Sequence, residues 1–153
     1  LARHEESAIT VIIVYDFDTL IRIWRSIVST NISRDPTNGY TRRSVEIPAG
    51  SRILYISGQT ATDDDGNTPA DAETQADIIY GKVVQSLEDA GMGVEDLVKT
   101  NVYLTNPSDI MAIVKAGQKY NPGGKQAGTL VYVKALARPE VLMELEAVAA
   151  KAD

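Results

Sequence analysis

The sequence has 153 residues and a formal net charge of −6, with 44% apolar and 24% charged residues, a balance that suits one globular domain with its own core. It contains no cysteine, which excludes disulfides, thiolate nucleophiles and cysteine-based zinc sites, and we expect a cytoplasmic location. The acidic balance argues against a nucleic-acid partner, because phosphate binding needs a basic face. The most apolar early stretch, Ala8–Val28, carries Asp16, Asp18, Arg22 and Arg25, which argues against a membrane-spanning helix.

The N-terminal part of the chain is predicted to hold a strand, a helix and a turn. The β-branched run Ile9–Tyr15 predicts the strand. Apolar residues at helical spacing after Asp18 predict a helix to about Val28, and a strand that begins near Ile27 competes for the same residues. The residues of Ser33–Tyr40 are typical of a turn cluster.

The next segment is predicted to be a β-hairpin. Thr41–Ile47 and Arg52–Gln59 have the composition of strands, and the turn Pro48–Ser51 between them predicts that they pair with each other. Thr62–Pro69 is rich in aspartate and turn-forming residues, so we expect it to be a loop.

The C-terminal half is predicted to alternate helices and strands. A long amphipathic helix is expected over Asp71–Ala90, with Gly91 as its C-terminal stop. The further elements are a strand at Leu97–Thr105, a helix from a Ser108 cap to about Tyr120, and two last strands at Thr129–Leu136 and Val141–Ala150. The order from Thr41 onward is β-β-α-β-α-β-β. This order predicts an α+β fold, with two helices on one face of a mixed sheet of four to five strands.

Five segments, in this order and spacing, resemble the RidA/YjgF family, also known as L-PSP-type endoribonucleases or reactive intermediate deaminases. They are IVSTN, NGY, ILYISGQT, QSLEDAGMGVEDLVKTNVYLT and TLVYVKALARPEVLMELEAVA. The resemblance covers about Ile27–Ala150, so we expect residues 1–26 to be an extension and 27–153 to form the domain. It implies a chorismate-mutase-like fold, a homotrimer whose sheets form a central barrel, and a small-molecule pocket at each subunit interface. The activity that it implies is the hydrolysis of reactive enamines and imines.

The resemblance also implies site residues. Tyr40 matches a tyrosine that lines the family's pocket, although it could equally be a turn aromatic that packs locally. Ser57, Gly58 and Gln59 match the family's SGQ strand end, where glycine lets a ligand approach the backbone, or else simply ends the strand. Glu144 matches a water-orienting glutamate and is the predicted catalytic residue, with a solvated or barrel-lining carboxylate as the alternative. Glu146 is predicted to be structural.

One departure from the family concerns its substrate-binding arginine. That position falls on Gly128, within one residue, and we expect Gly128, Thr129 and Leu130 to border the pocket. Glycine cannot supply the guanidinium fork that binds a carboxylate, and Lys125 is the nearest cation in the sequence. Val114 stands where many members have an asparagine. These two losses make the family's standard deaminase activity doubtful.

Other motifs do not indicate a metal or a cofactor. The string DDDGN lacks the spacing of a calcium loop, and GGKQ lacks the context of a phosphate loop. We therefore predict a homotrimer that binds or hydrolyses a small metabolite, with a carboxylate as one candidate, and that needs no metal or cofactor. A non-catalytic binding or regulatory trimer is the alternative. A ribonuclease is a third reading, and the acidic charge and the lone histidine, His4, count against it.

Overall fold

The structure of the chain is a computed structural model that describes residues 16, 18, 31–36 and 41–152. The predicted strand Ile9–Tyr15, the helix predicted after it (except Asp18) and the candidate pocket residue Tyr40 lie outside the described residues. The elements are β1 Ile32–Pro36, β2 Arg42–Glu46, β3 Arg52–Gln59, α2 Ala72–Asp89, β4 Leu97–Leu104, α3 Ile110–Tyr120, β5 Ala127–Tyr132 and β6 Met143–Lys151, with short 3₁₀ turns at Val94–Asp96 and Pro107–Asp109.

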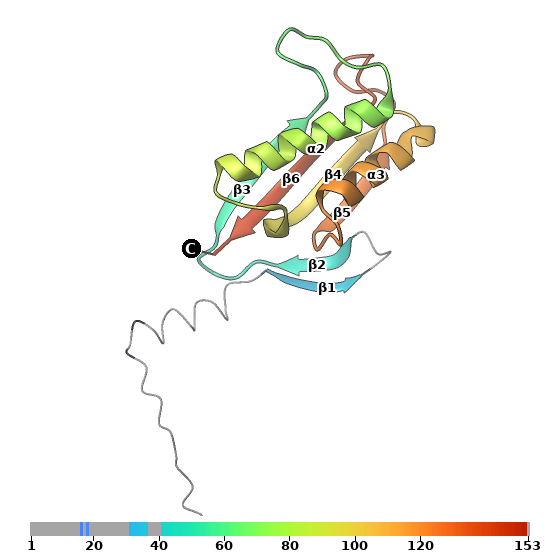
Figure 1. The fold of residues 1–153 in the computed structure, drawn as a ribbon. Helices are drawn as coiled ribbons and strands as arrows, with labels where there is room; N and C mark the ends of the chain where they lie inside the picture. Colours follow the sequence, from blue (N-terminus) through green and yellow to red (C-terminus); the bar gives the residue numbers. More distant parts are fainter. Residues whose placement is uncertain (1–15, 17, 19–30, 37–40, 153) are drawn as a thin grey trace, which may run out of the picture.

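The described elements form two layers. Helices α2 and α3 lie side by side over one face of the sheet, and α2 crosses above β3 and β6 (Figure 1). The predicted α+β architecture and the predicted element order from Thr41 onward are confirmed. Neither helix is long and apolar enough to cross a membrane, a statement that covers only the described part of the chain.

The sheet is mixed and has the strand order β1-β2-β5-β4-β6-β3. Strand β5 runs parallel to both β2 and β4, and the other neighbouring pairs are antiparallel. The prediction that β2 and β3 form a hairpin is therefore wrong. They lie in different parts of the sheet, because β2 pairs with β1 and β5 whereas β3 pairs with β6.

Strand β1 was not among the main predictions, since the sequence offered a strand before the turn cluster only as an alternative that begins near Ile27. Four of its five residues, Ser33–Pro36, fall within the segment expected to be a turn cluster. It pairs with β2 from Ile32 opposite Glu46 to Pro36 opposite Arg42. Proline is tolerated there because β1 is an edge strand. On the side without a neighbouring strand, the missing backbone N–H of proline removes no hydrogen bond between strands. In the described part of the chain the sheet consequently has six strands, more than the four to five expected.

Helix α2 forms where the sequence predicted it, for the expected reasons. The carboxylate of Asp71 accepts a hydrogen bond of 2.8 Å from the Thr74 amide, which satisfies a free donor of the first turn and lowers the pKa of Asp71. Gly91 adopts φ of 68°, the left-handed conformation that ends the helix. The stripe Ala76, Ile79, Val83 and Leu87 is buried against the sheet.

The start of α3 differs from the prediction. Asn106, rather than Ser108, is the capping residue, and its side-chain oxygen accepts a hydrogen bond of 3.1 Å from the Ser108 amide. A 3₁₀ turn follows, with Pro107 at its first position, and α3 itself begins at Ile110. Both asparagine and serine are good N-caps, so composition alone does not decide between them.

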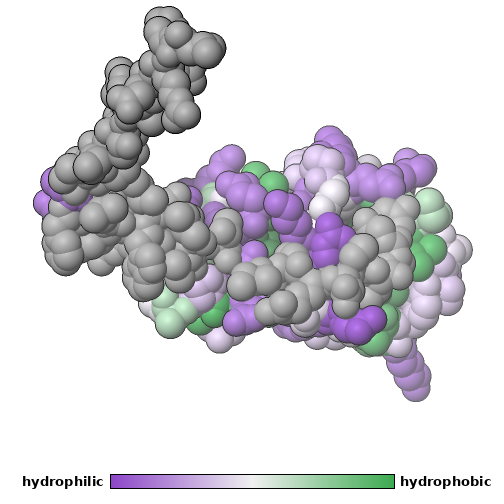
Figure 2. Space-filling view, turned by 90° about the horizontal axis from the view of Figure 1, so that it is seen from below, coloured by the Kyte–Doolittle hydropathy of each residue, from purple (hydrophilic) through white to green (hydrophobic). Residues whose placement is uncertain are grey.

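The two faces of the sheet differ in polarity. On β6, Met143, Leu145 and Ala147 are buried beneath the helices, and Glu144 and Glu146 point to the opposite face, as the alternation predicted. Ile53 and Tyr55 on β3 keep 50% and 77% of their surface exposed, and no described element covers them. The side of the molecule toward β1 and β2 also shows apolar residues scattered among hydrophilic ones (Figure 2).

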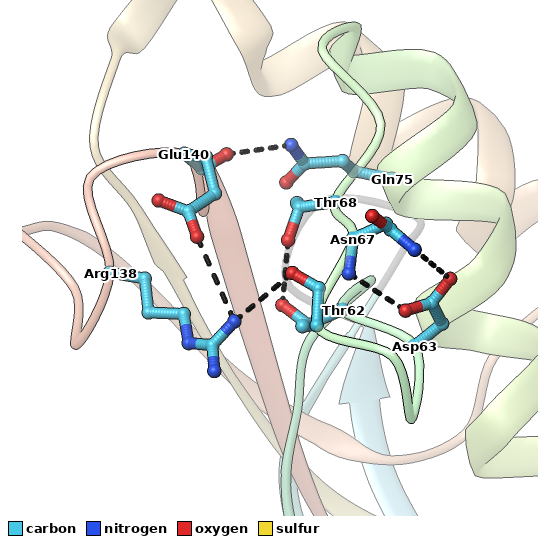
Figure 3. Close-up of polar contacts among 8 residues, drawn as sticks. Thr62, Asp63, Asn67, Thr68, Gln75, Arg138 and Glu140 are labelled. Carbon is cyan, nitrogen blue, oxygen red and sulfur yellow. Dashed lines mark hydrogen bonds and ion pairs between the residues drawn. The ribbon is translucent and has the colours of Figure 1, made fainter.

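The aspartate-rich segment is a loop, as predicted. Asp63 accepts hydrogen bonds from the backbone and side chain of Asn67, which lower its pKa, and Gly66 has φ of 87° (Figure 3). The guanidinium of Arg138, in the connection between β5 and β6, donates to the carbonyl of Gly66. Lys82 of α2 donates to the carbonyls of Thr60 and Thr62 and so holds the start of the loop.

Candidate functional site

A pocket of about 490 Å³ lies between α3 and strands β4 and β5. Its apolar wall is formed by Val102, Ile110, Ile113, Val114 and Leu130. Hydroxyl and amide side chains and four glycines complete the lining, namely Thr41, Tyr80, Thr100, Gln118, Asn121, Gln126 and Thr129, with Gly117, Gly123, Gly124 and Gly128. The volume is within the range typical of small-molecule sites.

The pocket includes the β5 residues that the sequence singled out. Gly128, Thr129 and Leu130 all border it, and so does Val114. A Cβ atom added at Gly128 would overlap Cγ2 of Thr41 and lie 3.3 Å from the Cβ of Thr41. Position 128, where the resemblance led us to expect an arginine in the family, is therefore closed to a side chain unless Thr41 moves. Lys125 is not among the residues that line the pocket.

A second group of predicted residues lies where β3 meets β6. A Cβ atom added at Gly58 would overlap Oε1 of Glu144 and lie 2.7 Å from its Cδ. The carboxylate of Glu144 consequently rests against the backbone of Gly58, a close approach that only glycine permits. Ser57 is exposed, and its carbonyl accepts a hydrogen bond from the side chain of Gln59.

The two groups do not meet within one chain. Gly128 is opposite Thr100, which is opposite Ala147, so Gly128 lies two strands and three residues from Glu144. At the usual spacings between strands and between residues along a strand, the backbone positions of Gly128 and Glu144 are roughly 14 Å apart. Moreover, Thr100 and Ala147 face the helices whereas Glu144 faces away from them. The sheet itself separates the two halves of the predicted site.

Glu146, the neighbouring carboxylate on β6, is held by two side chains of β4. Asn101 and Tyr103 donate hydrogen bonds of 2.7 and 2.9 Å to its Oε1. These bonds, with Asn101 first, lower the pKa of Glu146, and the bond to Glu146 raises the pKa of Tyr103. The sequence analysis did not predict a role for either Asn101 or Tyr103. Their alternation along β4 was the available signal, because it places them on the same face as Glu146.

Tyr80 is a further pocket residue that the sequence reasoning missed. Its ring stacks on Tyr120 with centroids 5.9 Å apart, and burial raises its pKa to about 12, so it is a neutral phenol at physiological pH. The amide of Asn121 donates to Gln126 Oε1 at 3.0 Å. Among the described residues, no group of three or more histidine, cysteine, aspartate or glutamate side chains is arranged to hold a metal ion.

Comparison with known proteins places these features in a family. The family model described as Endoribonuclease L-PSP matches residues 31–151. The Rid-family protein YyfB of Yersinia pestis, itself of unknown function, is 27% identical with a TM-score of 0.67, over 80% of this chain and 98% of that one. A protein of unknown function from Pseudomonas aeruginosa is 33% identical, with a TM-score of 0.58 over 80% and 87% of the two chains.

A further relative matches over a similar length. The RutC family protein of Pyrococcus abyssi is 26% identical over 129 residues, which are 83% of this chain and 98% of that protein. The family model alone spans most of the sequence, and it includes every described element from β1 to β6. The chain therefore belongs to the RidA/YjgF family, the family that the matching model describes as Endoribonuclease L-PSP.

Proposed function

We propose that the protein is a cytoplasmic homotrimer whose pockets, one at each subunit interface, bind or hydrolyse a small metabolite of the enamine or imine class. The observation that supports this most directly is the division of the candidate residues between two faces of one sheet. A complete site then needs β5 of one copy and the Gly58–Glu144 pair of another. In this proposal residues 1–26 form an extension outside the domain.

Glu144 is the residue that we propose for the chemistry. A carboxylate can take a proton from water as the water attacks an imine carbon, which makes it a general base. Its carboxylate occupies the space that a side chain at position 58 would otherwise fill, so the absence of a side chain at Gly58 is what allows this placement. In contrast to Glu146, whose Oε1 accepts two hydrogen bonds, Glu144 is not engaged by Asn101 and Tyr103.

A second candidate function is a trimeric binding or regulatory module without catalysis. Gly128 favours it, because the substrate carboxylate loses its expected partner and Thr41 occupies the space. A ribonuclease is the least supported reading. The net charge is −6 and the single histidine, His4, lies before the matched domain. A screen with freshly generated 2-aminoacrylate and related imines separates the enzyme from the binding module. Only an enzyme would release ammonia from these substrates faster than they hydrolyse in buffer alone.

The expected assembly gives the first prediction. Light scattering should yield about three times the chain mass of 16.6 kDa at micromolar concentration. The reason is the helix-free face of the sheet, where Ile53 and Tyr55 are exposed and no element within residues 31–36 and 41–152 covers them. A stable monomer under these conditions would refute the proposal, because the two halves of the site would then remain apart.

The contact between Gly58 and Glu144 gives the second prediction. Gly58→Ala should push the Glu144 carboxylate aside and lower the rate of any imine hydrolysis at least about tenfold. A tenfold loss corresponds to an increase of about 1.4 kcal/mol in the activation free energy. The melting temperature should change little, because the displaced atoms are the end of a flexible side chain. Gly81→Ala is the matched control, since a Cβ there meets nothing within 4 Å. Unchanged hydrolysis by Gly58→Ala would remove Glu144 from the mechanism.

A further inference from the structure

We propose that the pocket between α3, β4 and β5 selects a neutral ligand, with a short aliphatic part and an amide or hydroxyl group, over a carboxylate of the same shape. This inference rests on the proposed function, because it concerns the same pocket and names the class of molecule that it takes.

The lining of the pocket carries no charge. Every described residue that borders it is aliphatic, aromatic, glycine, hydroxyl-bearing or a carboxamide, and none is acidic or basic. An ionised carboxylate that enters such a site gives up its water shell without a charged partner among the side chains that border it, which is far more costly than the transfer of a neutral amide. Lys99, whose Nζ donates to Thr129 Oγ1 at 2.7 Å, is itself outside the lining. At Gly128, moreover, Thr41 fills the space that a cationic side chain would need.

The polar groups that remain suit a neutral partner. Thr100 and Gln126 are only 6% and 8% exposed, so hydrogen bonds to them form away from bulk water. Hydroxyl and carboxamide groups both donate and accept hydrogen bonds. The phenol of Tyr80 does the same, because burial raises its pKa and keeps it protonated. Because a neutral amide also has a donor and an acceptor, it can satisfy such a lining without an added charge.

The apolar wall defines the other end of the ligand. Ile110, Ile113 and Val114 come from one face of α3, and Val102 and Leu130 come from the sheet beneath it. Ile113 is 3% exposed and Val102 8%, so these side chains are fixed by packing. An aliphatic group of three or four carbons gains from contact with them. The pocket therefore combines an apolar side with a small number of neutral hydrogen-bonding groups.

A pair of probes with the same carbon skeleton tests the proposal on the full chain. 2-Methylpropanamide and 2-methylpropanoate differ only in the polar end group. Binding is followed by chemical-shift titration of the amide signals of Gly117, Gly123, Gly124 and Gly128, which border the pocket. Probes this small bind in the millimolar range at best, so the titration should extend to about 50 mM. We expect the amide to bind at least about tenfold more tightly than the carboxylate.

Leu130 provides the charge-switch variant, and a lysine outside the pocket provides its control. It borders the pocket and is 37% exposed, so a long side chain fits there without repacking the core. Leu130→Lys should reverse the preference in favour of 2-methylpropanoate, whereas Met111→Lys, at a 55% exposed residue that is not among those bordering the pocket, should leave the amide preference unchanged. Tighter binding of the carboxylate by the wild-type protein, binding of neither probe, or a Leu130→Lys variant that keeps the wild-type preference would each overturn the inference.

The outcomes are distinguishable from failure of the proposed function. A monomer in solution or the absence of imine hydrolysis would contradict the proposed function, and the wild-type preference between the two probes would still be measurable. Conversely, carboxylate selectivity in a trimer that hydrolyses imines would overturn only the neutral-ligand inference, because a neighbouring copy would then supply the cation.

Discussion

Replacing Gln75 by leucine is expected to lower the free energy of unfolding by about 3–5 kcal/mol, a large effect for one polar residue. Gln75 is fully buried at the start of α2. Its Nε2 donates to the carbonyls of Pro69 and Glu140 at 2.6 and 3.0 Å, and its Oε1 accepts from the Leu142 amide at 2.9 Å. Leucine would leave all three backbone groups without a partner.

These bonds join parts of the chain that are far apart in sequence. Figure 3 shows Gln75 reaching from α2 toward Glu140, on the connection that leads into β6. The same side chain holds the end of the aspartate-rich loop through Pro69. Because each unpaired buried group costs roughly 1–3 kcal/mol, the loss should appear as a lower denaturation midpoint with little change in its slope.

The control is the same substitution on the exposed side of the same helix. Gln85 is exposed and bonds only to Asp89, so Gln85→Leu should change stability by less than about 0.5 kcal/mol. Gln75→Glu keeps the shape but cannot donate to Pro69 and Glu140 when ionised, and it should destabilise as well. Urea denaturation at one fixed protein concentration measures all three variants. A loss below about 1 kcal/mol for Gln75→Leu would show that water replaces the three contacts.

Much of the fold follows from local patterns in the sequence. The stripe from Ala76 to Leu87 and the stop at Gly91 identify α2 because helical spacing, capping and glycine conformation are local properties. The alternation of Met143 and Leu145 with Glu144 does the same for β6. The predicted β2–β3 hairpin was wrong because a short turn suggests pairing, whereas partners are chosen by the whole sheet.

The candidate site depended more on tertiary structure. The close approach of Gly58 to Glu144 joins residues 86 positions apart, which no periodicity reveals. The crowding of Gly128 by Thr41 was equally inaccessible, because it follows from the unpredicted pairing of β2 with β5. Gln75 did leave a signal: it stands four residues before Ile79 on the buried stripe, and a polar residue in that position predicts a buried hydrogen-bonding role.

Wild-type protein is expected to hydrolyse 2-iminopropionate-type substrates weakly or not at all. The resemblance implies an arginine that binds the substrate carboxylate by two charge-assisted hydrogen bonds, and Gly128 stands where we expect that arginine. Loss of such a contact from a desolvated site costs about 2–5 kcal/mol, or roughly two to four decades in rate. The measurement is ammonia release or imine decay at fixed enzyme concentration. Robust wild-type turnover would contradict the expectation and would mean that another cation holds the carboxylate.

An arginine introduced at position 128 tests the same idea through a gain in imine hydrolysis. Gly128→Arg alone is expected to be impaired, because its Cβ would overlap Thr41 Cγ2. Thr41→Ala removes that methyl group and leaves a contact of 3.3 Å, which a small shift can relieve. The double variant Thr41→Ala/Gly128→Arg should therefore exceed Gly128→Arg in imine hydrolysis by at least about tenfold.

Two controls assign the gain to charge and to Glu144. Thr41→Ala/Gly128→Met adds similar length without a cation, so it should stay at the wild-type level. Glu144→Ala in the arginine background should abolish the gain, because the water would lose its proposed base. A folded trimeric double variant that remains silent would count against the enzyme. It would mean that the pocket differs from that of an imine hydrolase at more than one position. A binding module without catalysis would then explain the uncharged pocket and Glu144 better than an enzyme does.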